Sequence, residues 1–417
     1  MSDFDAIVVG AGCAGSVAAY TLAKAGKSVL MVERGNFAGA KNMTGGRIYA
    51  HSLKKVFPNF EKEAPVERRI MRERISLLDP TSNFTIGFAS EAMAQEGKDS
   101  YSVLFGPFDQ WLAEQAEDAG AEVICGIPVE DLVMDGSRVL GVVAGEDELT
   151  ADITILADGV NSLLTPKAVG APTPKPSEMA VGVKELIELP AEVIEDRLLC
   201  GPGEGAAWLF AGDSTKGHIG GGFMYTNKSS ISLGLVATLS DLVTAKTTIY
   251  QMMEDFKQHP EVAALIRGGK LVEYSGHMVS EGGYHMIPRL VGDGCLVAGD
   301  AGMLCMNLGY CVRGMDFAVA SGQLAAQAAI EAMDRKDFSA SSLNRYMELL
   351  ESSFVLRDMR QYQRFPHFME STKRIFNGMF VVDGEPQPPL KKKVLGSVKE
   401  VGLMNILKDV RGGMKAL

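Results

Sequence analysis

Two short apolar runs near the N-terminus flank a stretch of helical composition. Residues 5–9 (DAIVV) and 28–32 (SVLMV) are apolar without alternation, which predicts strands buried on both faces, as in a parallel sheet. Residues 16–25 between them are typical of a helix, which Gly26 ends. The order strand, helix, strand predicts a βαβ unit.

The same signals continue along the chain and divide it into two kinds of region. Strands are expected at residues 121–125, 129–134, 138–144, 151–159 and 294–300, and helices at 108–119 and 315–333. From about residue 181 to 274 the pattern is rich in strands, expected at 207–211, 218–225 and 231–237 with one helix at about 245–258. The pattern therefore predicts a sheet with helices and a second, β-rich region.

A glycine-rich turn joins the first strand of the βαβ unit to its helix. Gly10, Gly12 and Gly15 have the spacing G-x-G-x-x-G, which permits a tight turn, close approach of a pyrophosphate and packing of helix on strand. Free N–H groups at the helix N-terminus favour the diphosphate. Glu33 ends the second strand, 23 residues after Gly10, where it can accept hydrogen bonds from a ribose diol. The combination predicts a cofactor that contains ADP.

Length, charge and cysteine spacing narrow the function classes. A chain of 417 residues exceeds the ~250–300 residues of one core, so two or more domains are expected. The net charge of -11 argues against a general nucleic-acid binder. No apolar stretch reaches the ~18 residues of a membrane span, and residues 1–5 lack the basic start of a signal peptide, so a cytoplasmic location is expected. The six cysteines include no C-x-x-C pair, so no metal site is expected.

Two acids at the ends of expected strands favour FAD over a nicotinamide dinucleotide. Asp158 follows one strand and Asp300 another, and such a pair suits an extended dinucleotide lying across the sheet. Asp300 would bind the ribityl chain. The helix that opens near Gly314 would point N–H groups at the pyrimidine edge of the flavin. The backbone amide of Val129 is placed to meet the adenine.

Together these motifs resemble the FAD-dependent oxidoreductases of the aromatic-hydroxylase and geranylgeranyl-reductase type. The segments that sharpen the resemblance are residues 39–47, 181–185, 220–223, 305–309 and 313–316. They resemble the FixC branch of electron-transfer-flavoprotein:quinone oxidoreductases, over nearly the whole chain. This resemblance implies an α/β fold with a Rossmann-like FAD-binding domain of the glutathione-reductase/aromatic-hydroxylase type, an inserted β-rich α+β substrate domain and a C-terminal helical segment.

The resemblance also implies domain bounds and a binding site. The FAD-binding domain is expected at residues 1–80, 100–178 and 275–340, the substrate (quinone-side) domain at 81–99 and 179–274, and a helical, basic segment at 341–417. The cofactor-binding residues are expected to be Gly10, Ala11, Gly12, Cys13, Ala14, Gly15, Glu33, Arg34, Gly35, Lys41, Asn42, Met43, Thr44, Val129, Ala157, Asp158, Gly159, Gly299, Asp300, Asn307, Gly309, Gly314 and Met315. No catalytic side chain is expected, because the FAD carries the redox chemistry.

The chain departs from the family pattern in two places. Phe105 stands where the family usually has an arginine near the FAD phosphates, so that contact is expected to be weaker or made elsewhere. Eukaryotic-type members carry a C-terminal ferredoxin-like cluster domain, and this chain lacks its cysteines. The resemblance to the shorter FixC form implies a separate small ferredoxin-like subunit with an iron–sulfur cluster.

The C-terminal stretch at 391–417 is basic and contains apolar residues among its lysines. It holds seven basic residues against Glu400 and Asp409, a net +5 in a chain of net -11. Three interpretations stay open: contact with an anionic membrane surface on the inner face of the membrane, docking onto an acidic partner, or a solvated helical face.

The leading hypothesis is an electron-transfer enzyme. The resemblance implies that bound FAD accepts electrons from a two-subunit electron-transfer flavoprotein and passes them to a quinone, as a subunit of a FixABCX-like complex. The alternative is a flavin-dependent reductase or monooxygenase of a polyprenyl or aromatic substrate, which shares the FAD motifs. A third hypothesis is a relay subunit without catalysis of its own. The quinone site is suggested at residues 41–44 and 220–225, where three glycines either admit a planar ring or mark a strand bend.

Overall fold

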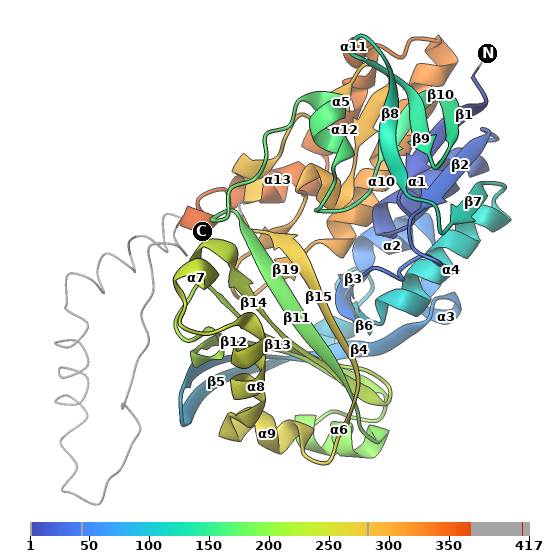
Figure 1. The fold of residues 1–417 in the computed structure, drawn as a ribbon. Coiled ribbons are helices and arrows are strands. Elements are labelled where there is room, and N and C mark those ends of the chain that lie inside the picture. The colour runs from blue at the N-terminus through green and yellow to red at the C-terminus, as the bar shows by residue number, and fades with distance from the viewer. Residues whose placement is uncertain (1, 43–44, 282, 368–410, 412–417) are drawn as a thin grey trace, which may run out of the picture.

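The chain folds into two units, each built around one sheet (Figure 1). The computed structural model describes residues 2–42, 45–281, 283–367 and 411. Two expected cofactor residues, Met43 and Thr44, lie outside the described residues. So does the basic stretch at 391–417, apart from Arg411.

The first unit contains the expected parallel sheet. Its strands are β1 (Phe4–Val9), β2 (Val29–Glu33), β7 (Glu122–Cys125), β10 (Asp147–Leu156), β16 (Val291–Gly292) and β17 (Cys295–Val297), with β8 (Val129–Asp135) and β9 (Arg138–Ala144) attached to β10. The order is β16-β17-β10-β1-β2-β7, and β1 pairs in parallel with both β10 and β2. The carboxyl ends of the parallel strands β1, β2, β7, β10 and β17 therefore meet at one edge, where ligands of such sheets bind. The predicted α/β fold class is confirmed.

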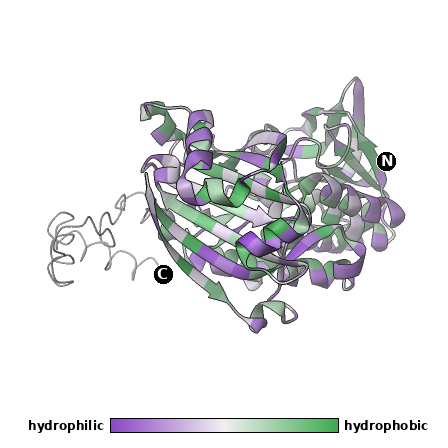
Figure 2. Ribbon diagram, turned by 90° about the horizontal axis from the view of Figure 1, so that it is seen from below, coloured by the Kyte–Doolittle hydropathy of each residue, from purple (hydrophilic) through white to green (hydrophobic). Residues whose placement is uncertain are grey.

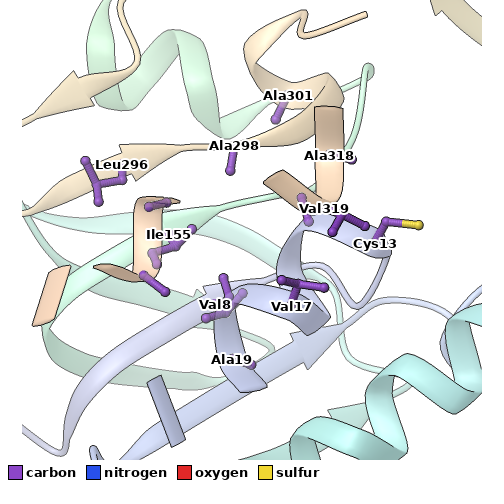
Figure 3. Packing of buried hydrophobic residues seen from close by; sticks show 14 of the residues in the cluster. Val8, Cys13, Val17, Ala19, Ile155, Leu296, Ala298, Ala301, Ala318 and Val319 are labelled. Atoms are coloured by element: carbon purple, nitrogen blue, oxygen red, sulfur yellow. The ribbon is translucent and has the colours of Figure 1, made fainter. Parts of the chain in front are cut away.

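Small residues let two helices pack closely on this sheet. The helices are α1 (Cys13–Lys24) and α10 (Met315–Arg335). A Cβ atom at Gly322 of α10 would lie 2.1 Å from the backbone oxygen of Ala14 in α1, so only glycine permits this approach. Figure 3 shows the apolar side chains that meet there, among them Val8, Val17, Ile155, Leu296 and Val319.

The second unit is built around a larger sheet. Its strands are β3 (Gly46–Tyr49), β4 (Val66–Asp79), β5 (Ser82–Ala89), β6 (Ser100–Val103), β11 (Met179–Glu188), β12 (Glu204–Gly212), β13 (Gly220–Thr226), β14 (Ser230–Thr238) and β15 (Lys270–Ser280). They follow the order β15-β11-β14-β13-β12-β4-β6-β3, with β5 on β4. Hydrophobic and hydrophilic residues mix along its long strands (Figure 2), as expected where the two faces of a sheet meet different surroundings.

Strand β4 was hidden in the sequence by its charged residues, and it widens the second unit. The larger sheet draws on residues 46–103 as well as 179–280, a wider range than the expected 81–99 and 179–274. Arg68 of β4 is only 2% exposed, yet it pairs with Glu195 at 2.6 Å. It also donates to the backbone oxygens of Asn227, Glu204 and Lys228. A charge so fully paired can lie inside a sheet, which the apolar pattern cannot reveal.

Helices α6 (Ala191–Leu198), α8 (Ile249–Gln258) and α9 (Pro260–Ile266) enclose an apolar core with one face of the larger sheet. The helix expected at 245–258 is wrong at its start, because α7 (Leu239–Thr244) ends before it and α8 begins only at Ile249. The side chain of Thr248 accepts a hydrogen bond from the backbone of Gln251 at 3.1 Å. This N-cap fixes the start of α8.

The remaining elements are helices and two short strands. They are α2 (Ala50–Val56), α3 (Phe60–Glu63), α4 (Phe105–Asp118), α5 (Leu164–Val169), β18 (Met306–Asn307), β19 (Val312–Arg313), α11 (Ala340–Leu343), α12 (Arg345–Ser352) and α13 (Phe354–Gln361). One-turn 3-10 helices lie at Glu91–Ala94, Asp213–Thr215, Gly283–Met286 and Gly299–Gly302. Within the described part of the chain, no helix combines the length and the apolar character needed to cross a membrane.

Candidate functional site

A cavity of about 720 Å³ is lined by both units. From the first unit it takes residues at the carboxyl ends of the parallel strands, among them Val9, Val32 and Ala157. From the second unit it takes residues of the larger sheet, among them Leu209, Phe223 and Val236. A molecule in this cavity would touch a nucleotide-type sheet edge on one side and a β-sheet face on the other.

The glycine-rich turn forms its part of the wall from backbone alone. Gly10 has φ +98°, and a Cβ atom there would lie 2.5 Å from the backbone oxygen of Ala157. A Cβ atom at Gly15 would lie 1.8 Å from the backbone oxygen of Gly10. At Gly12, the N-cap of α1, a Cβ atom would meet nothing within 4 Å. The turn thus packs tightly against its own backbone and that of the segment after β10. It leaves open space in front of the N-terminus of α1, which suits a diphosphate.

The carboxylate of Glu33 is held in a fixed orientation at the end of β2. Its Oε2 accepts a hydrogen bond from the backbone N–H of Ala11 at 3.0 Å, and its Oε1 accepts one from Gly35 at 2.7 Å. Glu33 also lines the cavity. Because each carboxylate oxygen can accept further hydrogen bonds, the fixed group remains able to receive the hydroxyls of a ribose.

Asp158, just beyond β10, carries a buried oxygen without a partner. Its Oδ1 is inaccessible to solvent and has no hydrogen-bond partner among the described groups. Burial raises the pKa of this carboxyl to about 6, although Ser162 and Arg34 act in the opposite direction. A buried acceptor without a donor is costly unless a ligand supplies one. The residue lines the cavity, so this orphan oxygen fits a bound group with hydroxyl or N–H donors.

The second acid, Asp300, lies in the 3-10 turn that follows β17. The turn starts at Gly299, whose φ is +63° and whose N–H donates to Ser321 Oγ at 3.0 Å. This bond ties the turn to α10. Asp300 lines the cavity, and burial raises the pKa of its carboxyl. The structure therefore brings Asp158 and Asp300 to one cavity from strands far apart in the chain.

Most of the expected cofactor residues line this cavity. They are Gly10, Gly12, Cys13, Ala14, Glu33, Arg34, Lys41, Asn42, Val129, Ala157, Asp158, Gly159, Asp300, Asn307, Gly309, Gly314 and Met315. The others that the structure describes lie behind the wall: Ala11, Gly15, Gly35 and Gly299. Ala11 and Gly35 act there through their amides to Glu33, and Gly15 and Gly299 through close packing.

Phe105 opens α4 and turns an apolar ring toward the cavity. A Cβ atom at Gly46 would lie 3.1 Å from this ring, so ring and backbone are in contact. The cations Arg34 and Lys41 line the same cavity, and side chains of this charge suit phosphate oxygens.

The glycines at 220–222 do receive a planar ring, but it belongs to the protein. A Cβ atom at Gly222 would lie 2.5 Å from the ring of Phe256 in α8, on the core side of the sheet. Gly221 and Gly222 also line the cavity. The glycines therefore serve internal packing at least in part.

Lys184, a cavity residue in the middle of β11, lies outside the cofactor residues expected from the sequence. It is only 3% exposed. Its signal in the sequence was a lysine that follows the apolar run at 179–183 within a predicted strand region. Arg313 likewise lies outside the expected cofactor residues. It donates to Asp316 through Nε at 2.8 Å and to Asp358 through Nη1 at 2.7 Å, which ties the start of α10 to α13.

Family profiles match three parts of the chain. "FAD dependent oxidoreductase" matches residues 5–165, "ETF-QO, ubiquinone-binding" matches residues 179–279, and "ETF-QO/FixC family C-terminal domain" matches residues 365–417. ETF-QO stands for electron-transfer-flavoprotein:quinone oxidoreductase. The cavity residues Val9, Val32 and Ala157 lie within the first match, and Leu209, Phe223 and Val236 lie within the second.

Whole-length relatives carry the same family names. The probable electron transfer flavoprotein-quinone oxidoreductase YdiS of Escherichia coli (strain K12) is 52% identical over 429 residues, covering 100% of both chains. Protein FixC of Salmonella typhi is 51% identical, covering 99% of both. Protein FixC of Azorhizobium caulinodans is 38% identical, covering 95% of this chain and 94% of its own.

Solved structures share the fold at low identity. A geranylgeranyl bacteriochlorophyll reductase-like protein from Thermoplasma acidophilum superposes with a TM-score of 0.72 at 19% identity, covering 98% of this chain and 99% of its own. The flavin-dependent brominase Bmp2 superposes with a TM-score of 0.65 at 15% identity, covering 95% and 93%.

Proposed function

The chain belongs to the ETF-QO/FixC family, and we propose that it accepts electrons from an electron-transfer flavoprotein and passes them to a quinone. It is an FAD-dependent oxidoreductase. The observation that carries the proposal is the shared cavity: one side is formed by the FAD-type sheet edge, and the other includes strands of the larger sheet that lie within the ubiquinone-binding match. Donor cofactor and acceptor can therefore occupy one space.

The residues present fit FAD. Open space in front of Gly12 accommodates a diphosphate, the fixed carboxylate of Glu33 suits the adenosine ribose, and the orphan Oδ1 of Asp158 calls for a donor. When bound, FAD supplies the redox chemistry, because its ring takes up and releases electrons. We propose that the full set of expected cofactor residues named above, Met43 and Thr44 included, holds it.

We propose the partners beyond the quinone on the grounds of family membership and charge. A FixABCX-like complex would supply a two-subunit electron-transfer flavoprotein and a ferredoxin-like subunit with an iron–sulfur cluster. The six cysteines of this chain lie at scattered positions, Cys13, Cys125, Cys200, Cys295, Cys305 and Cys311, which supports a cluster on a separate subunit. The net +5 at residues 391–417 supports a cytoplasmic protein that touches the inner face of the membrane.

The test uses the purified holoenzyme with chemically reduced electron-transfer flavoprotein and a short-chain ubiquinone. Quinone reduction should be faster than in a control with flavin-free protein by orders of magnitude. Reduction at the control rate would contradict the proposal. Prompt bleaching of the flavin by NAD(P)H alone would instead favour the reductase or monooxygenase. Protein that binds no flavin would favour the relay subunit.

A further inference from the structure

Lys184 projects from the middle of β11 toward the cavity. Across the sheet it pairs with Gly234 of β14, which in turn pairs with Phe223 of β13. Paired residues share a face of the sheet, and Phe223 lines the cavity. The neighbour Val183 belongs to the core on the opposite face, so alternation also places Lys184 on the cavity side.

The charge of Lys184 is buried without an ion-pair partner. The side chain is 3% exposed, and its Nζ donates to the backbone oxygen of Gly45. None of the carboxylates in the described ranges forms an ion pair with it. Glu185, the next residue, pairs instead with Lys257 at 2.8 Å. An ammonium has three N–H donors, so Lys184 keeps donors that a ligand can use.

The surroundings of this ammonium are apolar and aromatic. Its Nζ lies 5.3 Å from the centre of the Phe223 ring and 5.9 Å from that of Phe105. Ile75, Leu209 and Val236 also line the cavity. Burial lowers the pKa of Lys184 to about 7, although Glu273 on β15 favours the charged form. A retained cation of this kind is costly, which points to a use.

We propose that the Lys184 ammonium donates a hydrogen bond to a carbonyl oxygen of the quinone and gives that oxygen a proton when the quinone is reduced. This rests on the proposed function, which supplies the electrons from reduced FAD. A quinone is a flat apolar ring with two carbonyl oxygens, and those oxygens become negative as electrons arrive. An aromatic pocket with a buried ammonium matches both features.

The step balances in atoms and electrons. The reduced flavin gives up two electrons and releases its ring protons to water as it is oxidised, and the quinone takes up two electrons and two protons to become the quinol. One proton comes from Lys184, where an N–H bond breaks as the O–H bond forms, and the other comes from water. The neutral amine left on Lys184 regains its proton from water. Because the amine's pKa lies near neutrality, both directions of this transfer are easy.

The experiment separates the oxidation of the flavin from its reduction. Holoenzyme is reduced with dithionite, mixed with a short-chain ubiquinone, and the return of flavin absorbance is followed. Lys184→Met should slow this step about 100-fold, and Lys184→Arg, which keeps a cation, should slow it less, since a positioned acid contributes roughly 10²–10⁴-fold. Flavin oxidation by ferricenium, which takes an electron but no proton, should stay within about twofold.

Two further measurements guard the interpretation. The matched control is Lys257→Met, which removes an ammonium from the opposite side of β11 and should oxidise with quinone as the wild type does. Equilibrium binding of the quinone to the oxidised holoenzyme, followed by protein fluorescence, should weaken several-fold in Lys184→Met. Removing a buried unpaired charge should leave the protein at least as heat-stable as the wild type.

Each outcome decides. Wild-type quinone kinetics in Lys184→Met would overturn the proposal. Equal slowing with ferricenium, or loss of flavin, would also overturn it, because Lys184 would then act on the cofactor or the fold. If reduced wild-type enzyme is not oxidised by quinone at all, the proposed function itself fails, and the role of Lys184 with it.

Discussion

On both sides of the cavity, glycines let other groups come close to the backbone, but the groups that they admit differ. On the side of the first unit, Gly15 clears room for backbone: a Cβ atom there would lie 1.8 Å from the carbonyl oxygen of Gly10. On the side of the larger sheet, Gly222 clears room for a side chain, the ring of Phe256. Backbone atoms cannot move aside by a change of rotamer, whereas an aromatic side chain can rotate or be replaced by a smaller one. We therefore expect substitutions on the side of the first unit to lower the free energy of unfolding more than substitutions in the larger sheet.

Gly15→Ala should have the largest effect. The new methyl group would overlap the carbonyl of Gly10, and nothing there can move without displacing β1 from α1. We expect a loss of about 3–5 kcal/mol in the free energy of unfolding, measured by urea on flavin-free protein.

The matched control is Gly12→Ala in the same turn. A Cβ atom at Gly12 meets nothing within 4 Å, so the flavin-free protein should unfold as the wild type does while FAD binds at least about tenfold more weakly. Equal stability of the Gly15→Ala and Gly12→Ala proteins would refute the backbone contact.

Gly222→Ala should lower the free energy of unfolding by less than Gly15→Ala does. Unlike the effect of Gly15→Ala, its effect should be relieved by a second substitution. The added methyl group overlaps the Phe256 ring, and such overpacking costs about 1–3 kcal/mol. In a protein that also carries Phe256→Leu, the added methyl group has room. The double variant should therefore be nearly as stable to urea as Phe256→Leu alone. If the second substitution rescues nothing, the larger sheet would be as rigid as the glycine turn and the contrast would disappear.

Asp158→Asn tests the carboxylate that the first unit contributes to the cavity. Its folded-state pKa of about 6 lies above the ordinary value of 3.8, so the folded, flavin-free protein holds this proton more tightly than the unfolded chain. The wild type should therefore lose about 1–2 kcal/mol of stability as pH rises from about 4 to 6.

In Asp158→Asn that part of the pH dependence should vanish, because the amide does not titrate. Affinity for FAD at neutral pH should fall about tenfold, as a charge-assisted hydrogen bond is weakened. Urea unfolding across this pH range and flavin titration measure the two effects. An unchanged pH profile would mean that the carboxyl is not desolvated.

Thr248→Ala should have the smallest effect. It removes the N-cap of α8, which packs behind the larger sheet, and should cost about 1 kcal/mol without changing FAD affinity. Thr244→Ala, at an exposed hydroxyl near the end of α7, is the control and should stay within about 0.5 kcal/mol. A change in FAD affinity in Thr248→Ala would show that the second unit's outer layer influences the cofactor site.

The βαβ unit and its motif could be predicted because everything they need is close in sequence. Gly10, Gly15 and Glu33 lie within one strand–helix–strand segment, and their spacing follows from turn geometry and helix packing. Strand β4 could not be predicted in this way. Its charged residues interrupt the apolar pattern, and Arg68 becomes acceptable only when Glu195 and three carbonyl oxygens from segments distant in the chain surround it.

The sequence by itself determined the βαβ unit and the FAD motif, since these depend on local periodicity and on residue types at short spacing. Its resemblance to a known family supplied the branch of that family and the rest of the fold. Only the tertiary structure decided which side chains lie opposite each other across the cavity and between strands. Lys184 lies 139 residues from Gly45, to which it donates, and no periodicity within β11 can foretell that contact. Alternation tells which residues share a face of a strand, but the partner of that face is chosen by packing across the whole chain.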